Sequence, residues 1–396
     1  MPRPRSNATG EARYGAGWFA LVPAYRLATL RVALAVTTIV FHVPKFNGLI
    51  DAYLASAFHV PPAVDWIPPL TRVPGTALMA LQHVAAWGLL FGLGPRLCAW
   101  FLVVAGFYVL LLDPEHYAHN AQFHLTLLAL IGCSTDRVPL VRLIRPDDAA
   151  ARCPAWPEHL VRIQLGIVFF YAALDKIFSP FWRLSGVLLA AVDVTEHGPG
   201  LAWLQRLNRA AIRAFPSAMS VLTTTLELFL AVAFLYRPLW RAALVIGFVF
   251  VVYLEFLLRP GLFTWDVLAA LLVFVPAGDQ GWTVSHDAGC PSCRRDRLVL
   301  SRLDWLRRLR WVPTDDGSAH HERHLLGPRG RHYHGFDAVR VLPLIVPGPV
   351  FVVMALARFG GGFLAGRGYG PWYDLPFLVL AGWLLLWVPR RPVRTG

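Results

Sequence analysis

The chain has 396 residues, of which 56% are hydrophobic, and it carries a formal net charge of +13. Soluble domains are about 45–50% apolar, so this composition is typical of a membrane protein. The positive charge is almost entirely arginine, and no basic patch interleaved with aromatic residues stands out, so nucleic-acid binding is not expected. The first 26 residues lack the compact apolar core and the cleavage site of a signal peptide.

Eight apolar segments precede residue 280, and each approaches the roughly 20 residues that cross about 30 Å of hydrocarbon. Proline and glycine separate several of them, as in "GLGPR" and "LRPGLF". The sequence therefore predicts an all-α polytopic bundle of about eight spans embedded in a lipid bilayer. The expected spans are 27–43, 76–94, 97–113, 119–134, 159–178, 217–235, 239–258 and 262–277.

Arginines in the short loops predict the orientation, because cytoplasmic loops carry an excess of them. They favour a multi-pass protein of the cell (inner or cytoplasmic) membrane with a cytoplasmic N-terminal segment, 1–26. Lys176 is then expected at the outer end of its span. The outside loop 179–216 is an exception to the charge rule. Its segment "LAWLQRLNRAAIRAF" is amphipathic, and we expect it to lie along the membrane interface.

The composition changes near Gly278. Residues 281–313 indicate a short strand, a turn with two cysteines, an amphipathic helix and another strand, and the apolar blocks 341–364 and 374–389 follow. The expected fold is thus a membrane bundle with a small α/β unit and terminal apolar helices. The expected domains are a transmembrane domain at 27–278, an α/β region at 279–370, and a C-terminal apolar helix with a basic tail at 371–396.

Lys176 lies near the end of the fifth expected span, in "YAALDKIFSPFW". The chain has only one other lysine, Lys45, and lysine differs from arginine in that it can lose its proton when it is desolvated. Asp175 precedes it but points about 100° away around a helix. An ionisable residue inside a span usually faces the bundle interior or a wet cavity. The alternative is a lysine whose ammonium reaches the membrane interface.

Three carboxylates also fall in apolar segments: Glu227, Glu255 and Asp266, with Glu227 the deepest. A lone carboxylate in a span is expected to be protonated or paired with a basic residue. A structural hydrogen bond between helices is the alternative. Two groups of histidines, at 116–124 and 320–334, lack a complete set of metal ligands, so no metal site is assigned.

Cys290 and Cys293 form a Cys-x-x-Cys motif at the start of the helix expected after the first strand. A helix N-terminus favours the thiolate, and this spacing permits a reversible disulfide. A structural pair is the alternative. A structural zinc site would need a second pair of ligands.

Several pieces of the membrane part, taken in order, resemble the HTTM family, the bacterial relatives of vitamin K-dependent gamma-carboxylase. They are "LRVALAV", "IQLGIVFFYAALDKIFSPFWRLSGV", "LELFLAVAFLYRPLWR" and "PGLFTWDVLAALLVFV". The second piece is the most specific, and its matching residues are Tyr171, Ala172, Ala173, Lys176, Trp182 and Gly186.

The resemblance implies that Lys176 is a base that deprotonates a quinone cofactor in its hydroquinone form. Tyr171 and Glu227 are expected to contribute to the cofactor site. A histidine of the carboxylase's fourth span falls on Gln122 here, and a shifted register recruits His124 instead. The large extramembrane part that binds the carboxylase's protein substrate has no counterpart. We therefore expect quinone-linked chemistry rather than glutamate carboxylation.

A second resemblance covers about 281–370, through "TVSHDAGCPSCRRDRLVLSRLDWLRRLRWVP" and "GRHYHGFDAVRVLPLI". These stretches are similar to the DCC-type thiol-disulfide oxidoreductase-like family, which implies a thioredoxin-like unit with Cys290 and Cys293 as its redox pair. The sequence thus favours a membrane oxidoreductase or carboxylase-like enzyme. The alternative is a non-enzymatic transporter or an immunity or signalling protein, and nothing in the sequence determines the oligomeric state.

Overall fold

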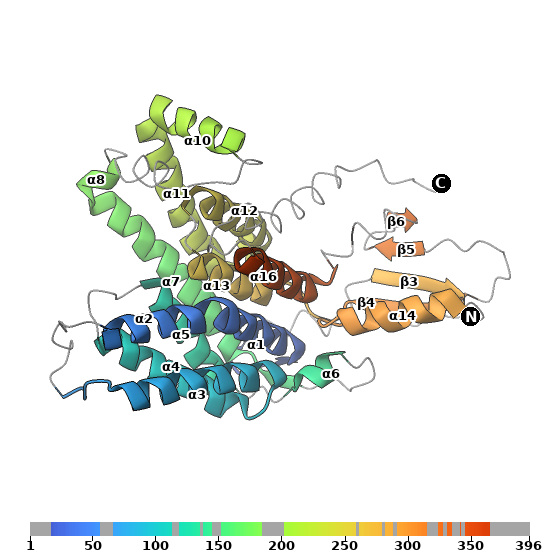
Figure 1. Cartoon of the computed structure of the whole chain (residues 1–396). Helices are drawn as coiled ribbons and strands as arrows, with labels where there is room; N and C mark the ends of the chain where they lie inside the picture. Colours follow the sequence, from blue (N-terminus) through green and yellow to red (C-terminus); the bar gives the residue numbers. More distant parts are fainter. Residues whose placement is uncertain are drawn as a thin grey trace.

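The computed structural model is mostly helical (Figure 1). It describes residues 17–55, 66–112, 119–134, 138–144, 152–183, 202–258, 261–278, 282–287, 291–314, 324–327, 331–334, 341 and 345–364.

Every one of the eight expected spans is helical. The helices are α1 (Tyr25–Thr37) with η2 (Thr38–His42), α3 (Arg72–Phe91), α4 (Pro95–Leu112), α5 (His119–Cys133), α7 (Trp156–Phe178), α11 (Pro216–Leu235), α12 (Trp240–Leu258), and α13 (Leu262–Leu271) with η5 (Leu272–Phe274).

Within the described residues, five helical segments are long and apolar enough to cross a membrane, fewer than the eight expected. They are Tyr25–Ala55, Arg72–Phe91, Pro95–Leu112, Pro216–Leu235 and Arg237–Glu255. Of the other three, α5 has 15 residues and Leu262–Phe274 is similarly short, below the roughly 20 that a span requires. The third, α7, has 23 residues but carries charged side chains near both ends. The chain is a multi-pass membrane protein on these grounds.

Some elements were not predicted from the sequence. Helix α2 (Val43–Ala55) continues directly from η2, which is a π-helix that joins α1 and α2 into one long helix. Strand β1 (Leu21–Pro23) pairs antiparallel with β2 (Arg152–Pro154) and ties the start of α1 to the start of α7. The short helices α6 (Leu140–Ile144) and α8 (Pro180–Arg183) complete the connections that the structure describes.

Helix α1 is the centre of the bundle, and every residue of it except Arg26 is buried. It packs against α3, α5, α13 and α16, so its side chains meet protein on all sides. Such a helix needs no polar face. Even Arg31 is fully buried, where its guanidinium donates hydrogen bonds to the backbone carbonyls of Leu89 and Val138. These carbonyl dipoles near the C-terminal end of α3 stabilise the cation.

A four-stranded sheet lies beyond one end of the bundle (Figure 1). Its strand order is β4-β3-β5-β6, with β3 (Trp282–Asp287) parallel to β4 (Leu309–Thr314) and antiparallel to β5 (His324–Gly327). Strand β6 (Arg331–His334) is antiparallel to β5, and α14 (Pro291–Leu303) connects β3 to β4. The expected order of strand, helix and strand is therefore confirmed.

The two ends of the bundle are distinct. At the sheet end, Arg307 follows α14, donates a hydrogen bond to the carbonyl of Arg142 in α6 (3.2 Å) and lies over the ring of Tyr25 at the start of α1. At the α8 end, α7 finishes and α8 begins (Figure 1). Helices α1 and α7 run from the sheet end toward the α8 end, whereas α5 and α13 run back toward the sheet end.

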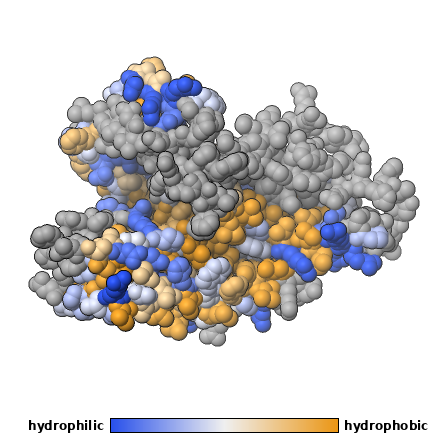
Figure 2. Space-filling model, viewed as in Figure 1, coloured by the Kyte–Doolittle hydropathy of each residue, from blue (hydrophilic) through white to orange (hydrophobic). Residues whose placement is uncertain are grey.

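Helix α16 (Pro347–Leu364) packs on α1 and α13, so the bundle includes a helix that follows the sheet in sequence. It forms most of the expected block 341–364; the block 374–389 lies outside the described residues. The amphipathic segment of the 179–216 loop is α10 (Ala202–Ala214). Figure 2 shows hydrophilic side chains gathered at α10 and near α14, and apolar ones over the middle of this face.

Candidate functional site

Lys176 and Glu227 form an ion pair between α7 and α11. The Nζ atom of Lys176 lies 2.8 Å from both carboxylate oxygens of Glu227, and the angles allow a hydrogen bond to Oε1 only. The two side chains are 15% and 5% exposed. The carboxylate is thus paired with a basic residue, and the same contact is a hydrogen bond between two helices, which was the structural alternative.

The last turn of α7 and the ring of Trp182 position Lys176. It lies in the last turn of α7, where its Nζ also donates to the carbonyl of Ala172 (3.2 Å). The ring of Trp182 in α8 stands 4.8 Å from Nζ, an approach that stabilises an ammonium by about 0.5–2 kcal/mol. Ser220 of α11 donates to the carbonyl of Trp182 (2.9 Å) and so ties α8 to α11.

Exposed aromatic side chains lie at the same end of the bundle as the pair. Tyr171, Phe178 and Phe181 are 64%, 72% and 74% exposed. At about 100° per residue, Tyr171 and Phe178 point away from Lys176 around α7, so the expected cofactor residue Tyr171 is not on the face of the pair. In a chain that crosses a membrane, such exposed aromatic side chains contact lipid. Asp175 is also exposed, and its carboxylate is close enough to the pair to act electrostatically on Glu227.

His124 belongs to a second polar cluster. Its Nδ1 lies 2.6 Å from Oδ1 of Asp266 in α13, and its Nε2 lies 3.1 Å from Oγ1 of Thr38 in η2. The imidazole of His42 stacks on that of His124 with 4.6 Å between ring centroids. All of these side chains are fully buried. The structure thus places His124 with Asp266 rather than with Lys176.

Aromatic side chains connect the two clusters. Phe123, which precedes His124, packs against Phe263 of α13, and Phe263 packs against Phe169 of α7 at centroid distances of 6.0 and 6.4 Å. Phe169 lies two turns before Lys176 on the same helix. The remaining candidate from the fourth span, Gln122, is exposed.

The sequence did not single out His42. Its position near the end of an apolar span could have marked it. An ionisable side chain within a membrane costs free energy and is usually functional. The π-helix Thr38–His42 is a further signal that only the structure provides, since single π-turns occur frequently at functional sites. No group of three or more His, Cys, Asp and Glu side chains within the described ranges is arranged to hold a metal ion.

The two cysteines of the motif are only partly covered by the structure. Cys290 lies outside the described residues. Cys293 lies in the first turn of α14, but its side chain is outside the described part. The helix containing it follows β3 at the sheet end, whereas Lys176 lies at the α8 end.

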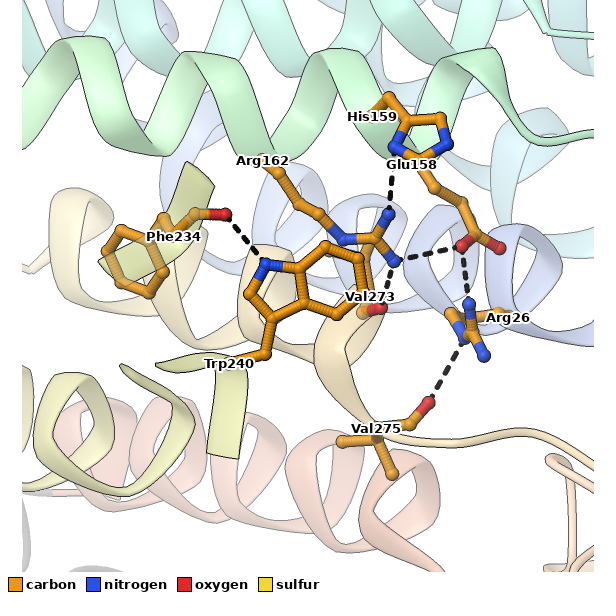
Figure 3. Close-up of polar contacts among 8 residues, drawn as sticks. All are labelled: Arg26, Glu158, His159, Arg162, Phe234, Trp240, Val273 and Val275. Carbon is orange, nitrogen blue, oxygen red and sulfur yellow. Dashed lines mark hydrogen bonds and ion pairs between the residues drawn. The ribbon is translucent and has the colours of Figure 1, made fainter. Parts of the chain in front are cut away.

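A third cluster of charged side chains, centred on Arg162, holds several helices together (Figure 3). Arg162 donates to Glu158 (3.2 Å) and to the carbonyl of Val273 (2.9 Å), and its guanidinium lies 4.1 Å from the centroid of Trp240. Arg26 also pairs with Glu158 and donates to the carbonyl of Val275. These contacts join α1, α7, α12 and the η5 region near the sheet end.

The HTTM domain matches residues 19–278 of the chain, from β1 to the loop after η5. No curated protein and no solved structure matches it.

Proposed function

Because the chain belongs to the HTTM family, we propose that it acts on a lipid-soluble hydroquinone, with the Lys176–Glu227 pair as the proton acceptor. The observation that carries this proposal is the 2.8 Å contact between Lys176 Nζ and Glu227 Oε1, with the ring of Trp182 4.8 Å from the same Nζ. A bound hydroquinone would supply phenolic protons to this pair.

The pair shares one proton between two atoms. With the proton on Nζ it is an ammonium and a carboxylate; with the proton on Glu227 both groups are neutral. Burial in a medium of low dielectric constant raises the free energy of the ammonium–carboxylate form. It therefore brings that form closer in free energy to the form in which both groups are neutral. In the neutral form Nζ has a free lone pair and can take a proton from a phenolic hydroxyl. Glu227 then holds the proton that lysine must give up first.

The residues around the pair fit an aromatic ligand. Trp182 presents its ring to Nζ, and the neighbouring Phe181 of α8 exposes its ring at the same end of the bundle. A hydroquinone ring would pack among these side chains and approach from the bilayer, while its hydroxyl would face Nζ. Arginine in place of Lys176 would keep the ion pair but could not accept a proton.

The thiols are proposed as the electron-exchanging partner, within a thioredoxin-like unit. The sheet order β4-β3-β5-β6 and the position of Cys293 at the start of α14 support this. Cys293, in the first turn of α14, lies at the sheet end and Lys176 at the α8 end, so we do not expect electrons to pass directly between the thiols and a quinone at Lys176. A lipid-soluble carrier that crosses the bilayer fits this separation. The loop arginines favour the cytoplasmic face of the cell membrane for the sheet end.

The test uses the full chain in lipid vesicles with a reduced naphthoquinone, without oxygen. The wild-type protein is expected to shift the ligand's absorbance toward that of the deprotonated quinol. Lys176→Arg should abolish the shift while retaining the pair's charges, and Glu227→Gln should reduce it. Asp51→Asn, which removes an exposed carboxylate on α2, serves as the control and should leave the shift unchanged.

A wild-type-like shift in Lys176→Arg would overturn the proposal. The pair would then be a structural link between α7 and α11, as expected for a non-enzymatic transporter, immunity or signalling protein.

A further inference from the structure

We propose that His42, His124 and Asp266 form a buried proton-binding site, loaded from the α8 end through Lys45 and Asn120. This site is separate from the Lys176–Glu227 pair, and the inference holds whether or not that pair acts on a hydroquinone. It rests on the hydrogen bonds around His124, on the unpartnered nitrogens of His42 and on a second polar contact one turn away.

The protons of the cluster can be counted from its hydrogen bonds. The hydroxyl of Thr38 donates its only hydrogen to the carbonyl of Leu34 (2.7 Å), so Thr38 Oγ1 accepts from His124, and Nε2 of His124 carries a hydrogen. The 2.6 Å contact between His124 Nδ1 and Asp266 Oδ1 requires a further proton between these atoms. The pair therefore holds one proton more than an aspartate beside a neutral imidazole.

This extra proton leaves the cluster electrically neutral, whichever atom carries it. It is shared by a carboxylate and an imidazole that are both fully buried. Its release would leave an unpaired negative charge away from water, which is costly unless a nearby group responds. Release and uptake break and form only the bond to hydrogen, and the proton comes from the aqueous phase.

His42 is placed to pass this proton on. Its ring lies between the rings of His124 and Phe46, at centroid distances of 4.6 and 4.0 Å. Within the described part of the chain, neither of its nitrogens has a hydrogen-bond partner, although the side chain is fully buried. Oδ2 of Asp266 is likewise unpartnered there. A neutral imidazole has one donor and one acceptor nitrogen, and proton transfer through a histidine uses both.

A second polar contact leads from His42 toward the α8 end. Lys45 follows His42 by three residues, and Asn120 precedes His124 by four, so helical spacing stacks the two contacts one turn apart. Lys45 Nζ donates to Asn120 Oδ1 (3.2 Å), and Lys45 is only half-buried. The Lys45–Asn120 contact thus lies one turn from the buried cluster, between α2 and α5, and the proposed route runs from the surface through it.

The other elements packed against the cluster bring few charges. The part of α16 whose side chains are described, Pro347–Ala357, contains no titratable residue. Helix α3 contributes His83, which bonds to Asn47 (3.1 Å), and α5 begins with His119. Asp266 is the only carboxylate within α13. His42, His124, Asp266 and Lys45 thus determine the charge of this region.

The test is infrared difference spectroscopy of the full chain in lipid membranes during pH steps. The wild-type spectrum is expected to show a reversible signal of the Asp266 carboxyl or the His124 imidazole. Asp266→Asn is isosteric and keeps a hydrogen bond to His124, but it cannot exchange this proton, so the signal should be lost. His124→Gln should remove it as well. Thr264→Val, a buried change two residues away, should leave it intact.

The rate at which the infrared signal appears tests the route from the surface. Lys45→Met should slow the appearance of the signal without changing its final amplitude, because the site remains and only its access is altered. His42→Phe keeps the stacked ring and should slow the signal further. Persistence of the full signal in Asp266→Asn would overturn the site, and an unchanged rate in Lys45→Met would overturn the route. The amide bands of the same spectra show whether each variant is folded.

Discussion

Gly348 of α16 lies directly against Thr29 of α1. A Cβ atom at position 348 would stand 2.7 Å from Thr29 Cγ2 and 2.8 Å from the indole of Trp305. Real Cβ atoms do not approach so closely, and the indole cannot move as a flexible side chain can. The helix that follows the sheet is thus docked on the centre of the bundle through a position that only glycine fills.

Gly348→Ala should therefore destabilise the protein by about 1–3 kcal/mol, the usual cost of overpacking. The measurement is thermal unfolding of the detergent-solubilised chain. Gly48→Ala in α2 is the control, because no atom lies within 4 Å of its added Cβ and it should be neutral or slightly stabilising. Equal unfolding temperatures for both variants would show that α16 is not docked on α1 as described.

Removing one member of the Lys176–Glu227 pair should cost more than removing both. Glu227→Leu leaves an ammonium that is only 15% exposed without its partner, and we expect a loss of about 2–4 kcal/mol. The double variant Lys176→Met/Glu227→Leu should recover most of this loss, since no unpaired charge remains. A double-mutant cycle of unfolding free energies measures the difference. Additive losses would mean that the two side chains do not interact.

Arg162 should not tolerate lysine. Its planar guanidinium bonds Glu158 and the Val273 carbonyl while it stacks on Trp240, and a lysine ammonium cannot do all of this at once. Arg162→Lys should lower stability by about 1–2 kcal/mol. Arg302→Lys, an exposed change on α14, should have almost no effect by the same unfolding measurement. If the two variants behave alike, the contacts of Figure 3 contribute nothing to stability.

The motif cysteines should differ in reactivity from the other three. Cys98, Cys133 and Cys153 form no disulfide within the described residues. Alkylation with a mass label before and after a reductant should detect two additional thiols only after reduction, and Cys290→Ser should remove this difference. A label count that does not respond to reductant in the wild-type protein would retire the redox role.

The sequence by itself determined the helices of the membrane part. All eight expected spans are helical, because apolar runs in a bilayer must satisfy their backbone hydrogen bonds internally and the helix does so within one segment. It also marked Lys176, Glu227, His124 and Asp266, since an ionisable side chain stands out against apolar neighbours. These features depend only on residues that are close together in the chain.

Only the tertiary structure decided which of these residues meet. Lys176 finds Glu227 51 residues later, and His124 finds Asp266 142 residues later, and no local pattern encodes such pairs. The same holds for α16, which docks on α1 through Gly348 although the whole sheet separates them in sequence. The rotation and register of packed helices place a side chain against its partner, and both are set by close packing across the whole bundle.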